Sequence, residues 1–460
     1  MIKMNFKRHI FDELVQWKTS SNAKPLILRG ARQVGKTTLV RSFGESYTHF
    51  IELNLEKSED ANLVERSNSV QELVNFLALK NEISPKDFPH TLLFIDEIQE
   101  SEKAISFLRY FYEDLPELNV IAAGSLLEHT LKKTKNYPVG RINYLYLFPL
   151  NFQEYLEAQG KNNLLERFRN VPVDDIAHEL LMKEFHTYCI IGGMPEIVAN
   201  YVANKDLLSL PQIYESIWNT YKDDVIKYAD SKSEENVMKH IVNTAASFVD
   251  QRIKFQNFGH SNYKSREVSK AFNNLDAAKV IQVIYPCTNV EPPILPDYKK
   301  SPRLQFLDTG ILNFDLNIQA DLLLMKDLSE AYKGAIIPHI INQEVLSLNT
   351  TDYKKTNFWV RDKTQSSAEV DLLIAHGKFL IPIEIKSGKT GSLKSLHQFV
   401  NQAPHQFAVR MYGGKFNIEE TVTPEGKPYL LMNLPYYLGT YLKQYINYLS
   451  RPKKSLHFLY

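Results

Sequence analysis

The sequence predicts an α/β protein that begins with a doubly wound parallel sheet and continues into a helical region and a second, smaller α/β domain. Two observations carry this prediction: apolar, strand-like segments alternate with amphipathic ones, and a glycine-rich loop joins the first strand to the next helix. The amphipathic segments at 69–80 and 103–113 have the period of helices. The strand-like segments lie at 26–28, 49–54, 92–96, 119–123 and 144–147.

The glycine-rich loop reads GARQVGKT and has the spacing of a phosphate-binding loop. Its two glycines let the backbone curl so that N–H groups point at an anion, and the positive end of the following helix adds to that field. We expect Lys36 to reach the β- and γ-phosphates of ATP and the Thr37 hydroxyl to take one Mg²⁺ position. The alternative is a glycine turn beside an exposed lysine. The expected nucleotide-binding residues are Gly30, Ala31, Arg32, Gln33, Val34, Gly35, Lys36, Thr37 and Thr38.

Such a site also needs a buried strand that ends in an acid, and TLLFIDE at 91–97 supplies one. An unbroken apolar run is typical of a central strand of a parallel sheet, and ligands of such sheets bind at the carboxyl ends of the strands. We expect Asp96 to hold Mg²⁺ together with Thr37, and Glu97 to polarise the attacking water. The alternative is a strand that ends in solvated acids.

Two further polar residues are candidates for the same site. Ser125 follows the fourth strand and is a candidate sensor of the γ-phosphate, although a small polar residue there is also ordinary turn chemistry. Arg141 could face a phosphate of its own subunit or of a neighbour, and Arg109 is a second candidate for the neighbour's site. Solvated surface arginines are the alternative. An arginine supplied by a neighbour implies a homo-oligomer.

Composition bounds the class of protein. The chain has 460 residues, of which 44% are hydrophobic and 23% charged, as expected of a globular protein with several domains. No apolar run is long enough to cross a bilayer, and an amphipathic segment follows residues 1–8, so we expect a cytoplasmic protein with no membrane partner. Cys189 and Cys287 are too few for a disulfide framework or a metal cluster and are expected in the core. The net charge of +1 gives no general bias toward nucleic acid.

Residues from 148 to about 230 have a helical pattern that is interrupted at 191–195, and we expect them to form a lid over the nucleotide. The order of a helix, a polar stretch, a second helix and a strand at 237–285 is typical of a winged helix-turn-helix. Its second helix could lie in a DNA groove, with phosphate contacts from Lys264, Arg266 and Lys270. Small winged domains also bind proteins, so a protein partner stays open.

The last domain carries a second group of charged residues. Segments 368–374 and 379–386 are joined by a turn at 376–378 and predict a β-hairpin. Residues two apart on a strand share a face, so Glu384 and Lys386 project together and could meet Asp371 on the neighbouring strand. Two carboxylates and a lysine can hold Mg²⁺ and activate water beside a scissile phosphate. The alternative is an amphipathic hairpin with a charged surface face.

Taken together, these motifs resemble bacterial and archaeal AAA-type ATPases that carry a carboxyl-terminal domain of unknown function similar to restriction endonucleases of the PD-(D/E)xK class. The resemblance covers nearly the whole chain and implies an AAA-type ATPase core at 1–148, a helical lid at 149–235, a winged helix-turn-helix at 236–330 and a nuclease-like α/β domain at 331–460. It rests on the loop at Gly30, LLFIDEIQ with Gln99, GSLLE at Gly124, Gly140 and Arg141 leading to FPL at 148–150 and Glu154, GGMPEIV at Gly192, FLDTG at 306–310, and the trio Asp371, Glu384 and Lys386.

One position departs from the endonuclease pattern. Such enzymes usually place a glutamate one helical turn after a glycine on the first helix of the domain, but Pro338 holds that position after Gly334, and Glu344 lies nearly two turns later. We therefore expect weak or absent nuclease activity and a carboxyl-terminal half that binds DNA or a protein partner. The expected function is Mg²⁺-dependent hydrolysis of ATP. The alternatives are a nucleotide-switched binding protein with little turnover and an ATP-gated DNA nuclease.

Overall fold

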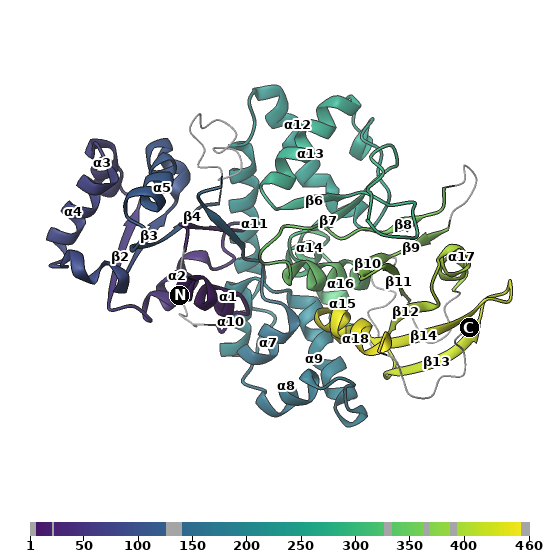
Figure 1. Ribbon diagram of the computed structural model, residues 1–460. Helices are drawn as coiled ribbons and strands as arrows, with labels where there is room; N and C mark the ends of the chain where they lie inside the picture. The colour runs from purple at the N-terminus through teal and green to yellow at the C-terminus, as the bar shows by residue number, and fades with distance from the viewer. Residues whose placement is uncertain are drawn as a thin grey trace.

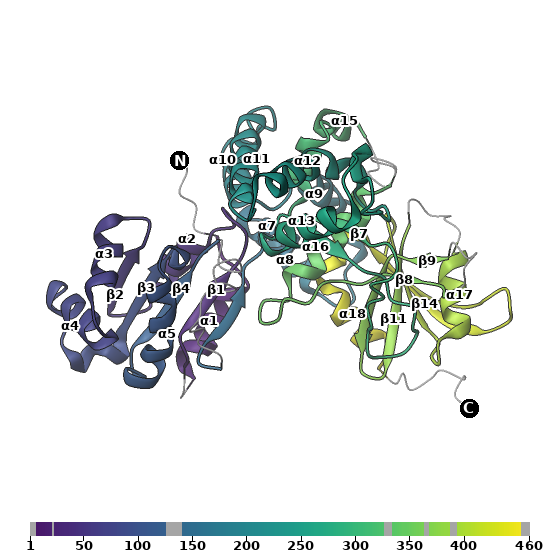
Figure 2. The same cartoon turned by 90° about the horizontal axis from the view of Figure 1, so that it is seen from above.

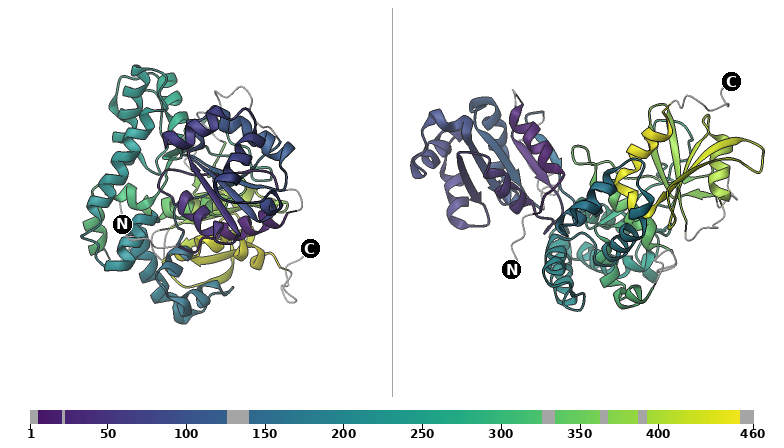
Figure 3. Two further views of the ribbon diagram at one scale, coloured as in Figure 1. Left: turned by 90° about the vertical axis from the view of Figure 1, so that its left-hand side faces the viewer. Right: turned by 90° about the horizontal axis from the view of Figure 1, so that it is seen from below.

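The computed structural model describes residues 6–20, 23–125, 140–325, 334–362, 368–386 and 393–451. An amino-terminal sheet lies at one end of the elongated molecule, helices fill the middle, and a second sheet lies at the other end (Figure 1, Figure 2). The right-hand view in Figure 3 shows the same separation of the two sheets. Part of one expected motif, residues 126–128 of GSLLE, lies outside the described residues. Among the described residues, no helix combines the length and apolar character needed to cross a membrane.

The amino-terminal sheet has five strands in the order β2-β3-β4-β1-β5, and every neighbouring pair is parallel. This confirms the predicted parallel α/β sheet, with the predicted strand ends shifted by one residue at most. Crossover connections between parallel strands place helices on the faces of the sheet, so we expect helices on both faces here. The strands are β1 (Leu26–Arg29), β2 (His49–Asn54), β3 (Thr91–Asp96), β4 (Asn119–Ala123) and β5 (Asn143–Tyr146).

Side chains of each central strand point alternately into two apolar cores. On β3, Leu92 and Phe94 pack in one core with residues of α1 (Ile10–Thr19) and α2 (Lys36–Gly44). Leu93 and Ile95 pack in the other core with the helices on the opposite face. Those helices are α3 (Ser58–Arg66), α4 (Val70–Lys80) and α5 (Glu102–Asp114). Because β4 lies between β1 and β3 and all three run in parallel, their carboxyl ends meet at one edge of the sheet.

The middle of the molecule is helical, as the sequence predicts. The predicted interruption is present, because α9 ends at Ile191 and α10 begins at Pro195. A Cβ atom at Gly193 would lie 1.9 Å from the Leu150 carbonyl oxygen, so only glycine allows this close approach. The helices are α7 (Phe152–Ala158), α8 (Asn162–Arg169), α9 (His178–Ile191), α10 (Pro195–Asn204) and α11 (Pro211–Ile226).

Two further helices and a short hairpin follow. Their order of helix, polar stretch, helix and strand is the expected one, and the second strand of the hairpin, β7, was not predicted. β6 and β7 are antiparallel, with Ile281 opposite Phe306. These elements are α12 (Lys232–Thr244), α13 (Ser265–Ala277), β6 (Ile281–Ile284), β7 (Arg303–Phe306), α14 (Thr309–Asp315) and α15 (Gln319–Leu324).

The carboxyl-terminal sheet is mixed, with the strand order β10-β11-β12-β14-β13. The predicted hairpin is present as the antiparallel pair β10 and β11. The predicted first strand is broken at Asp371, however, because β9 pairs with β8 and β10 pairs with β11, so the chain changes partner there. The elements are α16 (Ile336–Ser347), β8 (Trp359–Val360), β9 (Glu369–Val370), β10 (Leu372–His376), β11 (Phe379–Ile385), α17 (Lys394–Gln402), β12 (Phe407–Tyr412), β13 (Asn417–Val422), β14 (Pro428–Pro435) and α18 (Leu442–Leu449).

The segment after α16 returns to the amino-terminal sheet. Tyr146 on the edge strand β5 donates its backbone N–H to the Thr350 carbonyl oxygen at 2.7 Å. Tyr353 stacks on Phe148, with ring centroids 5.8 Å apart. The carboxyl-terminal part of the chain therefore covers one edge of the amino-terminal sheet.

Candidate nucleotide-binding site

The loop between β1 and α2 has the backbone that a phosphate-binding loop requires. Gly35 has a φ of +96° and stands at the N-cap of α2, and Gly30 has a φ of +156°. A Cβ atom at Gly30 would lie 2.4 Å from the Leu147 carbonyl oxygen. The N–H groups in the first turn of a helix have no carbonyl partner within that helix, so the start of α2 can receive an anion.

Lys36, the first residue of α2, is buried against this loop. Its ammonium group donates hydrogen bonds to the carbonyl oxygens of Gly30 at 3.0 Å and Ala31 at 2.8 Å. Burial lowers the pKa of Lys36 to about 8, although the neighbouring Glu97 and Asp96 carboxylates favour the charged form. The charge of Lys36 therefore depends on its surroundings.

Thr37 and Asp96 meet at the carboxyl edge of the sheet. The Thr37 hydroxyl donates a hydrogen bond to Asp96 Oδ2 at 2.7 Å. Asp96 is 4% exposed, and burial raises the pKa of its carboxyl group, while the Thr37 hydrogen bond opposes that rise. Hydroxyl and carboxylate oxygens are the donors that Mg²⁺ prefers, so this pair fits the metal that the sequence predicts.

Glu97 follows Asp96 in a left-handed conformation with a φ of +51°. Its carboxylate accepts a hydrogen bond from Gln99 Nε2 at 2.7 Å. Gln99 also lies against Gly124 at the end of β4, because a Cβ atom there would be 2.1 Å from Gln99 Oε1. Gln99 therefore orients Glu97 and connects it to the next strand, a role that was not predicted from the sequence.

Helix α11 lies against the phosphate loop and the end of β4. Arg32 Nη1 lies 2.5 Å from Asp224 Oδ1, and the Tyr221 hydroxyl donates to the Arg32 carbonyl oxygen. The Tyr228 hydroxyl donates to the Ser125 carbonyl oxygen at 3.2 Å. Arg32, Ser125, Tyr221, Asp224 and Tyr228 line one small pocket. Tyr221, Asp224 and Tyr228 were not predicted as site residues, since no local motif marks them.

Arg141 and Arg109 meet at one carboxylate. Their Nε atoms lie 3.2 Å and 3.0 Å from Glu113 Oε1, respectively. Arg141 precedes β5, which runs parallel to β1. Arg141 therefore lies at the amino-terminal ends of the strands, whereas the phosphate loop follows β1 at their carboxyl ends. This placement contradicts a contact between Arg141 and a phosphate of its own subunit, because the full length of the strands separates them. Both arginines remain candidates for a neighbour's site.

The predicted trio of Asp371, Glu384 and Lys386 lies together, and other charged residues contact it. Lys386 Nζ lies 2.6 Å from Glu384 Oε1, and Asp371 Oδ2 accepts the N–H of Ile385 at 2.8 Å. Burial raises the pKa of the Glu384 carboxyl group, and the nearby Asp371 charge adds to this rise. The structure therefore brings the three predicted side chains to one place.

Arg303 of β7 reaches into this trio from the middle of the molecule. Its guanidinium lies 3.1 Å from Asp250 Oδ1 and 3.6 Å from Asp371 Oδ1, and it also pairs with Glu369. This arginine was not predicted from the sequence. In the part of the chain that the structure describes, no group of three or more His, Cys, Asp or Glu side chains is placed to hold a metal ion.

Glu344 is not part of this group. It is fully buried between α16 and the middle helices, where it accepts hydrogen bonds from the Tyr188 hydroxyl at 2.7 Å and the Phe152 N–H at 3.1 Å. Burial raises the pKa of Glu344 to about 8. Its contacts join α16 to α7 and α9, which is a structural role.

The basic residues of α13 differ in their surroundings. Lys270 Nζ lies 2.7 Å from Glu234 Oε2 and 3.0 Å from Asp230 Oδ2. Arg266 and Lys264, which immediately precedes α13, are exposed. Of the three expected phosphate contacts, Lys270 is thus already paired with acids of its own chain.

Comparison with known families identifies the amino-terminal part. The glycine-rich loop on a parallel sheet, with a threonine and an acid in contact, defines a P-loop nucleotide-binding domain. Residues 22–156 match a family described as an AAA domain, so this segment is similar to AAA domains. Residues 182–322 and 333–425 match two further families, each described as a domain of unknown function. No curated protein matches the chain.

Several solved structures are similar to the chain at low identity. A Walker-type ATPase of Pyrococcus abyssi is 16% identical over 68% of this chain and 96% of its own, with a TM-score of 0.43. AMPPCP-bound DnaA from Aquifex aeolicus is 13% identical over 60% of this chain and 89% of its own, with a TM-score of 0.26. The Aeropyrum pernix Orc1 protein in complex with DNA is 11% identical over 70% of this chain and 96% of its own, with a TM-score of 0.24. At these scores the three structures carry no argument about function.

Proposed function

We propose that the protein is a Mg²⁺-dependent ATPase of the AAA type whose carboxyl-terminal half binds DNA or a protein partner. The observation that carries the proposal is the hydrogen bond between Thr37 and Asp96 beside the buried Lys36. These three side chains come from the start of α2 and the end of β3, and together they offer a cation and two oxygen donors beside a helix amino terminus.

ATP binds through the loop in this proposal. The N–H groups at the start of α2 donate to the β- and γ-phosphates, and Lys36 exchanges its two carbonyl contacts for phosphate oxygens. Mg²⁺, when bound, offsets phosphate charge, and Thr37 and Asp96 are the residues that would hold it. The remaining expected binding residues, 30–35 and 38, supply backbone.

Hydrolysis requires a group that orients water. Glu97 is the residue that we assign to this step, because Gln99 fixes its carboxylate at the carboxyl edge of the sheet. Ser125 lies at the end of the adjacent strand β4 and reads the γ-phosphate. Arg109 or Arg141 of a neighbouring subunit would stabilise the transferred charge, which makes a homo-oligomer part of the proposal.

Turnover of ATP tests this assignment. We expect Lys36→Ala and Glu97→Gln each to lower Mg²⁺-dependent turnover by at least about a hundredfold, as loss of a charge-stabilising or water-orienting group does. Glu117→Gln, an exposed glutamate before β4, is the control and should keep wild-type turnover. Unchanged turnover in both site variants would contradict the proposal. Binding of ATP with negligible wild-type turnover would favour the alternative of a nucleotide-switched binding protein.

Nucleotide state can reach the α12 and α13 pair through α11. The Tyr228 carbonyl oxygen, just after α11, accepts a hydrogen bond from Asn274 Nδ2 at 3.1 Å, while the Tyr228 hydroxyl contacts Ser125. Asn274 also donates to Glu234 Oε1 at 2.7 Å. This short series of contacts runs from the end of β4 to α13, the helix that we propose to face a partner.

DNA is the partner that Lys264 and Arg266 favour, and salt dependence tests it. The full chain should bind duplex DNA more weakly as salt rises, and the double change Lys264→Glu and Arg266→Glu should reduce both the affinity and this dependence. Affinity that does not depend on salt or on these residues would favour a protein partner. Supercoiled plasmid cut in the presence of Mg²⁺ or Mn²⁺, and left intact by Asp371→Ala, would instead favour the ATP-gated nuclease.

A further inference from the structure

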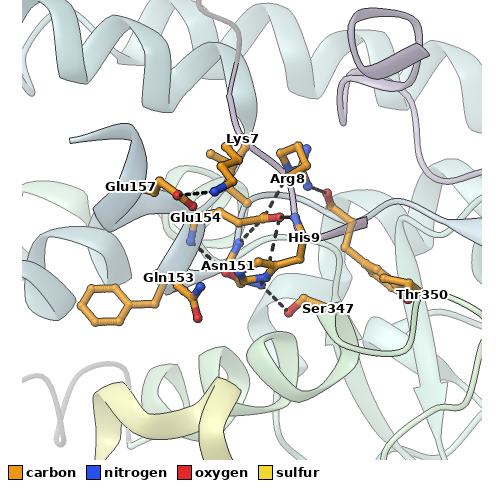
Figure 4. A network of polar contacts seen from close by, with 12 residues as sticks. Lys7, Arg8, His9, Asn151, Gln153, Glu154, Glu157, Ser347 and Thr350 are labelled. Atoms are coloured by element: carbon orange, nitrogen blue, oxygen red, sulfur yellow. Dashed lines mark hydrogen bonds and ion pairs between the residues drawn. The ribbon is translucent and has the colours of Figure 1, made fainter. Parts of the chain in front are cut away.

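We propose that Arg8 is a positioning residue for the phosphate loop and that it joins this loop to the carboxyl-terminal half. The inference rests on the proposed ATPase function. Figure 4 shows the polar network that carries it, in which Arg8 lies among residues of the amino-terminal segment, α7 and the region around α16.

Arg8 holds the backbone on both sides of the site. Its Nη1 donates to the Val34 carbonyl oxygen at 3.1 Å, and its Nη2 donates to the Phe148 carbonyl oxygen at 2.6 Å. The side chain is 6% exposed. A Cβ atom on Gly35 would lie 3.9 Å from Arg8 Nη1, so the guanidinium borders the loop directly.

The hydrogen bond to Val34 fixes the direction of a loop amide. The peptide unit between Val34 and Gly35 is planar, so its C=O and N–H point to opposite sides. While Arg8 holds the carbonyl oxygen on one side, the Gly35 N–H is aimed to the other, immediately before Lys36. Without Arg8 this peptide could rotate, because Gly35 has unusual conformational freedom.

Glu154 fixes Arg8 in turn. Its Oε2 lies 3.1 Å from Arg8 Nε, and the same carboxylate accepts the N–H groups of His9 at 2.8 Å and Asn151 at 3.2 Å. Glu154 and Asn151 form the capping box of α7. An arginine suits this place because two separate guanidinium nitrogens donate to two carbonyl oxygens while its charge stays paired with Glu154, a spread that a single ammonium nitrogen does not reproduce.

The network continues to the carboxyl-terminal half. Asn151 Nδ2 lies 3.3 Å from Ser347 Oγ on α16 and 3.1 Å from His9 Nδ1. The Thr350 hydroxyl donates to Glu13 Oε1 at 2.6 Å. The segment that carries Arg8 therefore touches the phosphate loop, α7 and the chain around α16, so a change at the loop alters contacts of the distant half.

Steady-state kinetics of Arg8→Met, Arg8→Lys and Glu154→Gln test this inference, together with the affinity for a fluorescent ATP analogue. We expect Arg8→Met to raise KM and weaken analogue binding by about tenfold, the effect of losing one charge-assisted hydrogen bond, while kcat changes less than about twofold. Arg8→Lys should recover part of the loss, and Glu154→Gln should add nothing to Arg8→Met in the double variant. Lys7→Met, whose side chain is 74% exposed, is the matched control.

A lowered melting temperature with unchanged KM and analogue affinity would overturn the inference, since Arg8 would then serve stability alone. If Arg8→Met does not fold, unchanged values in both Arg8→Lys and Glu154→Gln overturn it equally. Failure of the proposed ATPase function looks different: wild-type turnover would be absent or insensitive to Lys36→Ala. The analogue affinities would still report on Arg8 in that case.

Discussion

The guanidinium of Arg32 and the carboxylate of Asp224 form an ion pair of 2.5 Å that joins the phosphate loop to helix α11. Asp224 is buried and Arg32 is half-buried, so the pair lies at the boundary between the AAA domain and the helices that follow it. A ligand that moves the loop must also act on α11, because the two share this contact.

Changing Asp224 to Asn should loosen this boundary. We expect a loss of about 1–2 kcal/mol in the free energy of unfolding and weaker ATP binding, because Arg32 loses the closer of its two charged partners, the other being Glu56 at 3.5 Å. Asp223→Asn, on the exposed side of the same helix, is the control and should change neither. Denaturant unfolding and nucleotide titration measure the two effects. Equal results for both variants would contradict a specific role of the pair.

The affinity for ATP should fall as the pH rises through 8. Burial lowers the pKa of Lys36 to about 8, so the free protein loses the ammonium charge above that pH. Because phosphate binding favours the charged form, affinity should drop by up to about tenfold per pH unit above 8. Titration with a fluorescent ATP analogue from pH 6.5 to 9.5 measures this slope. Lys36→Arg stays charged, so the same slope in that variant would show that another group is responsible.

Glu344 should make the protein less stable at higher pH. Its pKa is about 8 in the folded state and near the ordinary value of 4.5 when unfolded, so the folded state holds one proton more between these limits. The free energy of unfolding contributed by Glu344 is therefore full below pH 4.5 and falls by up to about 1.4 kcal/mol per pH unit until pH 8. Glu344→Gln should remove this decline in denaturant melts at several pH values. The exposed Glu179→Gln is the control, and a decline that persists in Glu344→Gln would refute the assignment.

Arg303 should stabilise the folded protein by offsetting the charges of three nearby acids. Arg303→Met leaves Asp250, Glu369 and Asp371 without their shared cation, and we expect a loss of about 3–5 kcal/mol, typical of removing one partner from a buried ion group. The exposed Arg252→Met is the matched control. Thermal unfolding measures the difference. A variant as stable as wild type would mean that water or Lys386 already satisfies these carboxylates.

The amino-terminal sheet could be predicted because its buried central strands contain unbroken apolar runs, of which 92–95 is the clearest. Lys36, Thr37 and Asp96 could be located because a glycine-rich loop and an acid at a strand end are local signals. The contact between these residues was an expectation. It forms because the strands pair in parallel, which brings their carboxyl ends together.

Other parts of the site carry no local signal. Asp224 lies 192 positions from Arg32, and nothing in its own segment distinguishes it from other acids of an amphipathic helix. Arg303 stands at the start of a strand only four residues long, so periodicity does not show which acids it will meet. The break in the predicted strand at Asp371 depends on which strand pairs with each side of it, a tertiary choice that residue pattern does not encode.

The contact between Tyr146 and Thr350 bears on how copies of this chain can assemble. An open edge strand is a template for another chain, and here the backbone N–H of Tyr146 is already used within the molecule. A second copy therefore cannot extend the amino-terminal sheet at this position of β5, and a ring of subunits would have to form through other surfaces. A protein cut after α7 would lose Thr350, and its bared β5 edge would promote aggregation during attempts to study the AAA domain alone.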